Sequence, residues 1–127
     1  METTDRITIN KNMATYANIL VHQGADFLTT ITVEEETHDL VNHDGYTIKG
    51  QITKTYASET AYEIQLNPLV EDEGIVEFLI PSETTKQLRP GRYLYDVYVQ
   101  SPNAVTDKLI EGIVTVRPRI TRLEEHD

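Results

Sequence analysis

Hydrophobic and polar residues alternate with a two-residue period along most of the chain, and the period of an amphipathic helix is almost absent. Thr, Val, Ile and Tyr fill the alternating runs, and these residue types suit a pleated, half-buried sheet. The segment Ile75–Ile80 is apolar at nearly every position except Glu77, which predicts a strand covered on both faces. The pattern predicts about seven short strands. They lie at Asn18–His22, Phe27–Glu34, Ile48–Thr53, Tyr62–Leu66, Ile75–Ile80, Tyr93–Gln100 and Leu109–Val116.

Turn-forming residues separate these runs at about the spacing of a small sandwich, roughly 8–12 residues. Asp44-Gly45 and Pro90-Gly91 are strong turn signals, and only Pro81–Leu88 has the pattern of a helical turn. We therefore predict an all-β fold, an antiparallel β-sandwich of about seven strands with immunoglobulin-like topology. Its nearest rivals are a small jelly roll and a partly open barrel. The predicted core comprises Phe27, Ile31, Val33, Ile48, Ile52, Phe78, Tyr93, Tyr95, Val97 and Val114.

Both ends of the chain fall outside the strand pattern, so we expect an arm at residues 1–15, a sandwich at 16–118 and a tail at 119–127. Ile7 and Ile9 alternate with polar residues, which predicts a strand that adds to the free edge of a partner. Arg117, Arg119 and Arg122 are three of only 11 basic residues, and we expect them to pair with carboxylates of a neighbouring subunit. The alternative is that these arginines stay solvated.

Charge and composition exclude several classes of partner. The 21 acidic residues outnumber the 11 basic ones, which gives a formal charge of −10 that repels nucleic-acid backbones and anionic membranes. The chain has no cysteine, so it has no disulfide, thiolate metal site or cysteine nucleophile. Aliphatic runs are too short to span a bilayer, and the polar first residues predict no secretory signal. We expect assembly in a cytoplasm.

Candidate chemistry is sparse. The pairs His38-Asp39 and His43-Asp44 offer metal-ligating groups, but their spacing fits a solvated turn better than a known metal motif. The acidic runs Glu34–Glu36 and Glu71–Glu73 leave weak calcium binding open, with a solvated turn as the simpler interpretation. Serines stand outside nucleophile motifs, and the six glycines form no phosphate-binding loop. We therefore predict no enzyme activity, catalytic residue, cofactor or metal.

Tyrosine is the enriched aromatic residue, with seven copies against two of phenylalanine. Tyr93 and Tyr95 share one face of a strand and are predicted to pack in the core with their hydroxyls at its rim. Tyr98 on the other face, together with Tyr56, is predicted to form a contact surface, because tyrosine is favoured at interfaces. Exposed tyrosine is also common on free sheet faces, which remains the alternative.

Several stretches, taken in order, resemble small virion structural proteins of contractile-tailed bacteriophages and the N-terminal immunoglobulin-like module of phage baseplate upper proteins. The resemblance spans about residues 14–118. It implies a structural subunit of a virion, present in many copies or as a homo-oligomer, with other virion proteins as partners and with no nucleic-acid or membrane contact. It carries over no catalytic residue. The stretches are Tyr16–Ile19, Gln23–Phe27, Gly45–Ile52, Leu88–Val97 and Ile110–Pro118.

The expected place in the particle is the tail, baseplate or neck, with docking through the edges of the sandwich and its terminal arms. Two other functions remain open at this point. One is a decoration protein on the capsid surface. The other is a carbohydrate-binding module for host attachment, in which Tyr56 and Tyr98 would stack on sugar rings.

Overall fold

The computed structural model describes residues 6–9, 15–33, 47–68, 75–100 and 106–121. In these ranges the chain forms nine strands and one helix of a single turn, so the predicted all-β fold is confirmed. The elements are β1 (Arg6–Ile9), β2 (Thr15–Tyr16), β3 (Ile19–His22), β4 (Phe27–Val33), β5 (Thr47–Thr53), β6 (Ala61–Pro68), β7 (Ile75–Ile80), α2 (Ser82–Thr85), β8 (Gly91–Gln100) and β9 (Thr106–Arg117).

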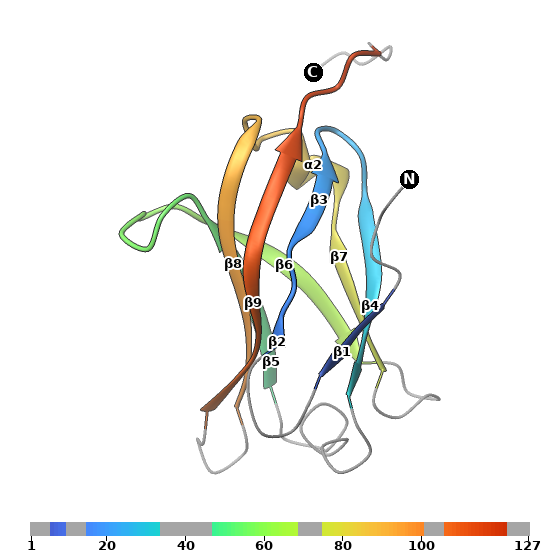
Figure 1. Cartoon of the computed structure of the whole chain (residues 1–127), viewed down its shortest axis with the longest axis vertical. Helices are drawn as coiled ribbons and strands as arrows, with labels where there is room; N and C mark the ends of the chain where they lie inside the picture. The colour runs from blue at the N-terminus through green and yellow to red at the C-terminus, as the bar shows by residue number, and fades with distance from the viewer. Residues whose placement is uncertain (1–5, 10–14, 34–46, 69–74, 101–105, 122–127) are drawn as a thin grey trace.

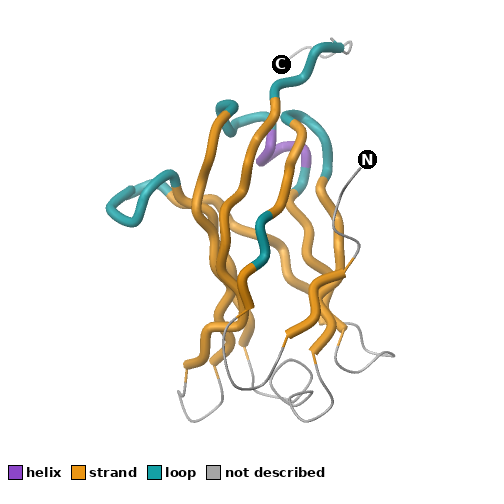
Figure 2. The backbone as a smooth tube through the Cα atoms, viewed as in Figure 1, coloured by secondary structure: helices purple, strands orange, loops and turns teal. Residues whose placement is uncertain are grey.

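The strands form two layers, and β6 belongs to both (Figure 1). Residues 61–64 of β6 pair with β5, and residues 65–68 pair with β7. The first sheet therefore has the order β1-β4-β7-β6. The second has the order β6-β5-β8-β9, with β2 and β3 both on the far edge of β9. The tube in Figure 2 shows how strands make up nearly all of both layers.

This strand order is that of an immunoglobulin-like sandwich, in which four strands of one sheet face a three-stranded core of the other. The antiparallel pairing expected of the sandwich holds among β4 to β9 but not at the outer strands, because β1 runs parallel to β4, and β2 and β3 run parallel to β9. No hairpin turn joins the members of these three pairs. Their direction is therefore free of the antiparallel constraint that a short turn imposes.

The core lies between the two layers and is centred on Phe78. Its ring meets Phe27 and Tyr95 edge-to-face, with centroid distances of 6.0 and 5.9 Å. Eight of the ten predicted core residues are buried, and Ile48 packs partly buried against them. The side chain of the tenth, Val33, lies outside the described part. The buried eight are Phe27, Ile31, Ile52, Phe78, Tyr93, Tyr95, Val97 and Val114.

The strand β7 is not covered on both faces, contrary to the prediction from its apolar run. Val76, Phe78 and Ile80 are fully buried toward the core, whereas Ile75, Glu77 and Leu79 are only partly buried. A two-sheet sandwich explains the difference, since each of its sheets has one face toward the core and one toward the surface.

A β-bulge in β9 determines which face of the sheet Lys108 and Glu111 occupy. The register of β8 with β9 shifts between Val97, which pairs with Ile110, and Tyr98, which pairs with Lys108. Leu109 is therefore an extra residue on β9, and Leu109 and Ile110 are both buried. Because of this extra residue, Lys108 and Glu111 point to the same face although three positions separate them.

The connection from β7 to β8 is fixed by partly buried hydrogen bonds of Thr85 and Tyr93. The Tyr93 hydroxyl donates to the Arg89 carbonyl at 2.9 Å, the arrangement of the tyrosine corner in immunoglobulin-like domains. The buried Thr85 hydroxyl donates to the Ala25 carbonyl at 2.9 Å and accepts from the Gly24 amide at 3.0 Å. These contacts tie α2 and the turn before β4 together at one end of the sandwich.

Candidate functional site on the outer face of the second sheet

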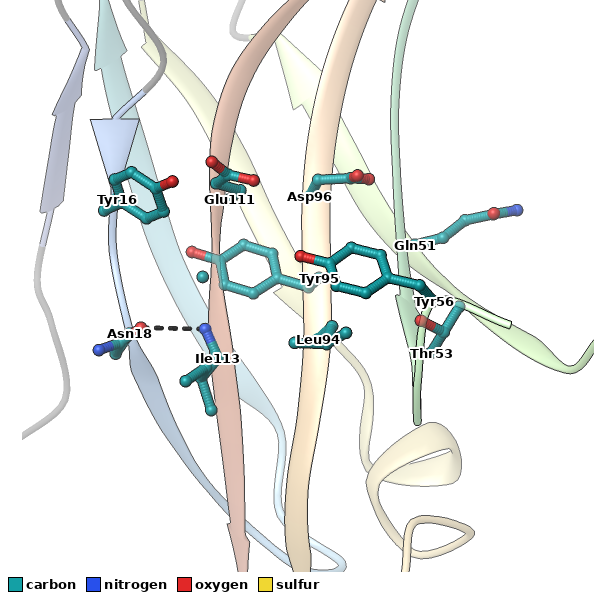
Figure 3. Close-up of a pocket in the computed structure, with 11 residues that line it drawn as sticks. Tyr16, Asn18, Gln51, Thr53, Tyr56, Leu94, Tyr95, Asp96, Glu111 and Ile113 are labelled. Carbon is teal, nitrogen blue, oxygen red and sulfur yellow. Dashed lines mark hydrogen bonds between the residues drawn. The ribbon is translucent and has the colours of Figure 1, made fainter. Parts of the chain in front are cut away.

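The outer face of the second sheet carries a hollow of about 530 Å³, which we call the outer-face pocket. This volume lies within the range of ligand-binding clefts. Side chains from β5, β8 and β9 form its floor, the edge at β2 forms one side and the turn after β5 forms the other (Figure 3). Its lining residues are Tyr16, Asn18, Gln51, Thr53, Tyr56, Leu94, Tyr95, Asp96, Glu111, Gly112 and Ile113.

Strand register places one polar row across the pocket. Gln51 is paired with Asp96, Asp96 with Glu111, and Glu111 with Tyr16, so four neighbouring strands each supply one side chain. The next row toward the end of β9 is more apolar, with Leu94 opposite Ile113. The pocket floor thus passes from a carboxylate-rich row to an apolar row.

The two carboxylates of the polar row have different surroundings. Glu111 accepts a hydrogen bond from the Lys108 ammonium at 2.9 Å. The Tyr16 hydroxyl foremost, and then the Lys108 ammonium, lower the pKa of Glu111, and the bond to Glu111 raises the pKa of Lys108. Asp96 makes no side-chain hydrogen bond to any described residue.

The pKa of Asp96 is raised, chiefly because burial disfavours its charged form. The charge of Glu111 raises this pKa further, and the charge of Lys108 opposes the rise. Two carboxylates and one ammonium leave one net negative charge at the polar row when all three are ionised. The outer-face pocket is therefore an acidic site in which the ammonium of Lys108 pairs with Glu111 rather than with Asp96.

Backbone contacts hold the β2 edge of the pocket in place. The buried Tyr95 hydroxyl donates to the Ala17 carbonyl at 2.6 Å, and the Ala17 amide donates to the Glu111 carbonyl at 3.0 Å. The Asn18 side-chain oxygen accepts from the Ile113 amide at 3.0 Å (Figure 3). Burial raises the pKa of the Tyr95 hydroxyl, so it stays a donor over the ordinary pH range.

Tyr56 stands at the opposite side of the pocket, in the turn between β5 and β6. The turn is closed by the Thr55 amide, which donates to the Ser58 hydroxyl at 2.9 Å. Tyr56 also lines a smaller hollow of about 230 Å³. Leu94 and Ile113 line both this hollow and the outer-face pocket. In Figure 3 its ring extends from the β5 side toward β8. Tyr56 is 91% exposed, so its side chain is accessible to a partner.

The sequence-predicted contact residues Tyr56 and Tyr98 both lie on this outer face, but only Tyr56 lines the pocket. Tyr98 pairs with Lys49 and Lys108 on the neighbouring strands. The Lys108 ammonium lies 5.7 Å from the centroid of the Tyr98 ring, within the range of a cation–π contact. Whether either tyrosine contacts a partner stays a prediction.

The other predicted contact residues lie elsewhere. Ile7 and Ile9 belong to β1, which adds in parallel to β4 of its own chain, opposite Ile31 and Val33. One edge of this strand is therefore used within the chain, although the residues were expected to form an arm. Thr15, at the end of the same expected arm, belongs to β2.

Two of the three predicted contact arginines can be placed. Arg117 ends β9, pairs with His22 and is exposed. The exposed Arg119 lies with its guanidinium beside Gly24. Arg122 lies outside the described residues.

The loop chemistry weighed in the sequence also lies outside the described part. This holds for the pairs His38-Asp39 and His43-Asp44 and for the runs Glu34–Glu36 and Glu71–Glu73. Across the residues that the structure does describe, no three His, Asp or Glu side chains group as a metal site. No helix in these ranges has the length and apolar composition to cross a membrane.

Sequence reasoning missed Tyr16, Asp96 and Glu111 as members of one site. The alternation along β8 assigns Asp96 to the face opposite the buried Tyr95. The alternation along β9 likewise assigns Glu111 to the face opposite the buried Ile110. Their pairing needed the register of two strands, which the bulge at Leu109 shifts by one residue. Tyr16 reaches the site only through the parallel pairing of β2 with β9.

Comparison with known proteins finds partial likeness to solved structures of low sequence identity. No protein-family model and no curated protein matches the sequence. An internalin-like protein of Listeria monocytogenes is similar over 87% of this chain and 30% of its own, with 18% identity and a TM-score of 0.48. The bradyzoite-specific antigen BSR4 of Toxoplasma gondii is similar over 94% and 51%, with 6% identity and a TM-score of 0.43. AggA, the major subunit of the aggregative adherence fimbriae type I of Escherichia coli, is similar over 82% and 91%, with 9% identity and a TM-score of 0.38. This chain thus spans about a third of the first protein and half of the second.

Proposed function

We propose that the protein is a non-enzymatic structural subunit of a contractile-tailed bacteriophage particle and docks on its tail, baseplate or neck. The observation that carries the docking role is the gathering of exposed aromatic side chains on one face of the second sheet. Tyr16, Tyr56 and Tyr98 lie on this face with exposed fractions of 76%, 91% and 37%. Tyrosine is enriched in interfaces, because its rigid ring gives a large contact area and its hydroxyl can hydrogen-bond.

The scaffold beneath this face supports a docking role because it holds the face rigidly. Every buried side-chain nitrogen or oxygen of the described residues has a hydrogen-bond partner. The Tyr95 hydroxyl and the Asn18 side chain fix the β2 edge from two sides. A surface whose shape is set in advance loses little conformational entropy when a partner binds.

Sheet edges give a second means of attachment. Among the described strands, β1 is paired with β4 alone and β3 with β9 alone, so each sheet ends in a strand with an open side. Such edges accept a strand from a neighbouring protein through backbone hydrogen bonds. This supports the expectation that the subunit is present in many copies and contacts other virion proteins.

The virion assignment itself rests on the sequence resemblance. The resembling stretch Leu88–Val97 holds the tyrosine corner formed by Tyr93 and Arg89, and the stretch Ile110–Pro118 holds β9 beyond the bulge. These are parts of a scaffold, in keeping with a structural role. Assembly takes place in the host cytoplasm under this proposal.

The test is immunogold labelling of purified particles from the phage or prophage that encodes the chain, with an antibody raised against the recombinant protein. Gold at the tail, baseplate or neck supports the proposal. Gold spread over the capsid indicates a decoration protein instead. Particles that lack the chain in an immunoblot would overturn the virion role.

A carbohydrate-binding function is the second candidate, favoured by the position of Tyr56 beside the amide and carboxylate groups of the outer-face pocket. Aromatic rings next to such groups suit sugar rings, which have apolar faces and polar edges. A glycan array separates the candidates. Binding to a defined glycan that Tyr56→Ser abolishes would favour host attachment over docking.

A further inference from the structure

We infer that the outer-face pocket receives an arginine side chain of a partner protein, held between Tyr16 and Tyr56 and paired with Asp96. The inference deepens the proposed function and rests on it for the existence of a protein partner. It names the chemistry of the contact: one guanidinium at the polar row, with an apolar neighbour over Leu94 and Ile113.

The charge of the pocket selects a cation. Asp96 and Glu111 are directly paired across β8 and β9, and like charges at such positions repel each other. The Lys108 ammonium is hydrogen-bonded to Glu111 at 2.9 Å and lies over the Tyr98 ring, so it is already engaged. Asp96 has no hydrogen-bond donor among the described side chains. A cation that enters the pocket supplies that donor and cancels the net negative charge of the row.

The aromatic walls favour arginine over lysine. Tyr16 and Tyr56 line the pocket from opposite sides, and their rings are 76% and 91% exposed. A planar guanidinium can stack on a tyrosine ring while its edge donates two hydrogen bonds to a carboxylate. A lysine ammonium is a strongly hydrated point charge and gains less from a flat ring. The amide of Gln51 is committed to Glu63, to which it donates at 2.5 Å.

The rest of the molecule fits the same partner. The chain has a formal charge of −10, which attracts basic segments and speeds their approach. Beyond Leu94 and Ile113, the smaller hollow is lined by Lys54 and Arg92 and is positively charged. A guanidinium is repelled from that end, so the charge pattern directs it to the Asp96 end. The apolar row between them accommodates an aliphatic neighbour.

The test uses the whole chain, labelled with ¹⁵N, titrated with the peptide acetyl-Leu-Arg-Leu-amide and followed by NMR chemical shifts. The control peptide carries citrulline, the neutral isostere of arginine, in the central position. We expect the arginine peptide to shift the amides around the pocket and to bind at least about tenfold more tightly than the citrulline peptide, because charge-assisted hydrogen bonds are the stronger kind.

Two protein variants complete the test. Asp96→Asn should lower the affinity for the arginine peptide by about tenfold. The control Glu77→Gln, on β7 of the first sheet, makes the same change in charge and should leave this affinity unchanged. Equal binding of both peptides, shifts outside the pocket, or unchanged binding to Asp96→Asn would overturn the inference. The inference would also be overturned if a neutral trisaccharide shifted the same amides and bound more tightly than the peptide. That result would identify a glycan site.

The outcome is separable from that of the proposed function. If the peptide binds as expected but particles lack the chain, the arginine site stands and the virion role fails. If the chain is found on particles but the arginine peptide does not bind as expected, the virion role stands and the arginine site is rejected.

Discussion

Replacing Gly112 by alanine should disrupt the edge of the outer-face pocket. A Cβ at this position would lie 2.2 Å from the Ala17 carbonyl oxygen and 2.8 Å from its carbon, both of which are backbone atoms. A Cβ essentially never lies within 3.0 Å of another such atom, so the backbone at Ala17 must move by at least about 0.8 Å. This movement strains or breaks the hydrogen bonds that join Ala17 to Tyr95 and Glu111.

The expected loss of unfolding free energy follows from these contacts. Each lost hydrogen bond costs about 1 kcal/mol, and overpacking against fixed backbone costs a further 1–3 kcal/mol or so. Alanine restricts the unfolded chain more than glycine does, which returns about 0.5–1 kcal/mol. With both hydrogen bonds lost, we expect Gly112→Ala to lose about 2–4 kcal/mol and to lower Tm by roughly 6–16 °C.

The assay is urea unfolding followed by far-ultraviolet circular dichroism, with Gly50→Ala as the matched control. A Cβ at Gly50 would meet its nearest atoms at 3.0–3.2 Å, which is tight but needs a shift of only a few tenths of an ångström, far less than at Gly112. The control should therefore lose about 1 kcal/mol or less. Equal losses for the two variants, or a Gly112→Ala chain within about 0.5 kcal/mol of wild type, would refute the reasoning.

Three further predictions concern single side chains. Thr85→Val removes a fully buried hydroxyl that is hydrogen-bonded to the backbone of Gly24, Ala25 and Ser82 and should cost about 2–3 kcal/mol in urea unfolding, with Thr85→Ser retaining most of the stability. Tyr93→Phe removes the 2.9 Å bond to the Arg89 carbonyl and should cost about 1 kcal/mol by the same assay, whereas a chain as stable as wild type would leave the tyrosine corner without a stabilising role. The raised pKa of Asp96 means that the folded chain holds this proton more readily than the unfolded chain, so wild type loses stability as pH rises above the ordinary aspartate value of 3.8. Asp96→Asn should therefore be more stable than wild type at pH 7 and lose that advantage below pH 3.8, and a constant difference between the two pH values would contradict this.

Much of the fold could be predicted from the sequence, because one buried face per strand imposes a two-residue period. The run Tyr93–Gln100 shows why: its four inward side chains are buried, and its outward ones are partly or fully exposed. The run Ile75–Ile80 shows the limit, since apolar residues on both faces do not reveal which face is buried. Composition alone does not distinguish a half-covered strand from a fully covered one.

Parallel pairing and the bulge could not be predicted, because neither has a local signal in this chain. The pairing of Thr15 and Tyr16 with β9 joins residues about 95 positions apart, with no turn to specify direction. Leu109 and Ile110 are both apolar, so alternation alone allows either to face the core. The pairing brings Tyr16 to the site, and the bulge sets Lys108 and Glu111 on one face.

The polar row of the second sheet is not needed to hold the core together. Asp96 faces Glu111 across the sheet, and a neutral side chain at either position would remove the repulsion without opening the core. The core-facing residues on both sides of Asp96, Tyr95 and Val97, are buried and depend on no charge at position 96. Burial raises the pKa of Asp96, and a partly buried carboxylate that costs stability is typical of the trade-off that the proposed arginine site would involve. The expected gain in stability of Asp96→Asn, together with its expected loss of arginine binding, ties these two effects to one side chain.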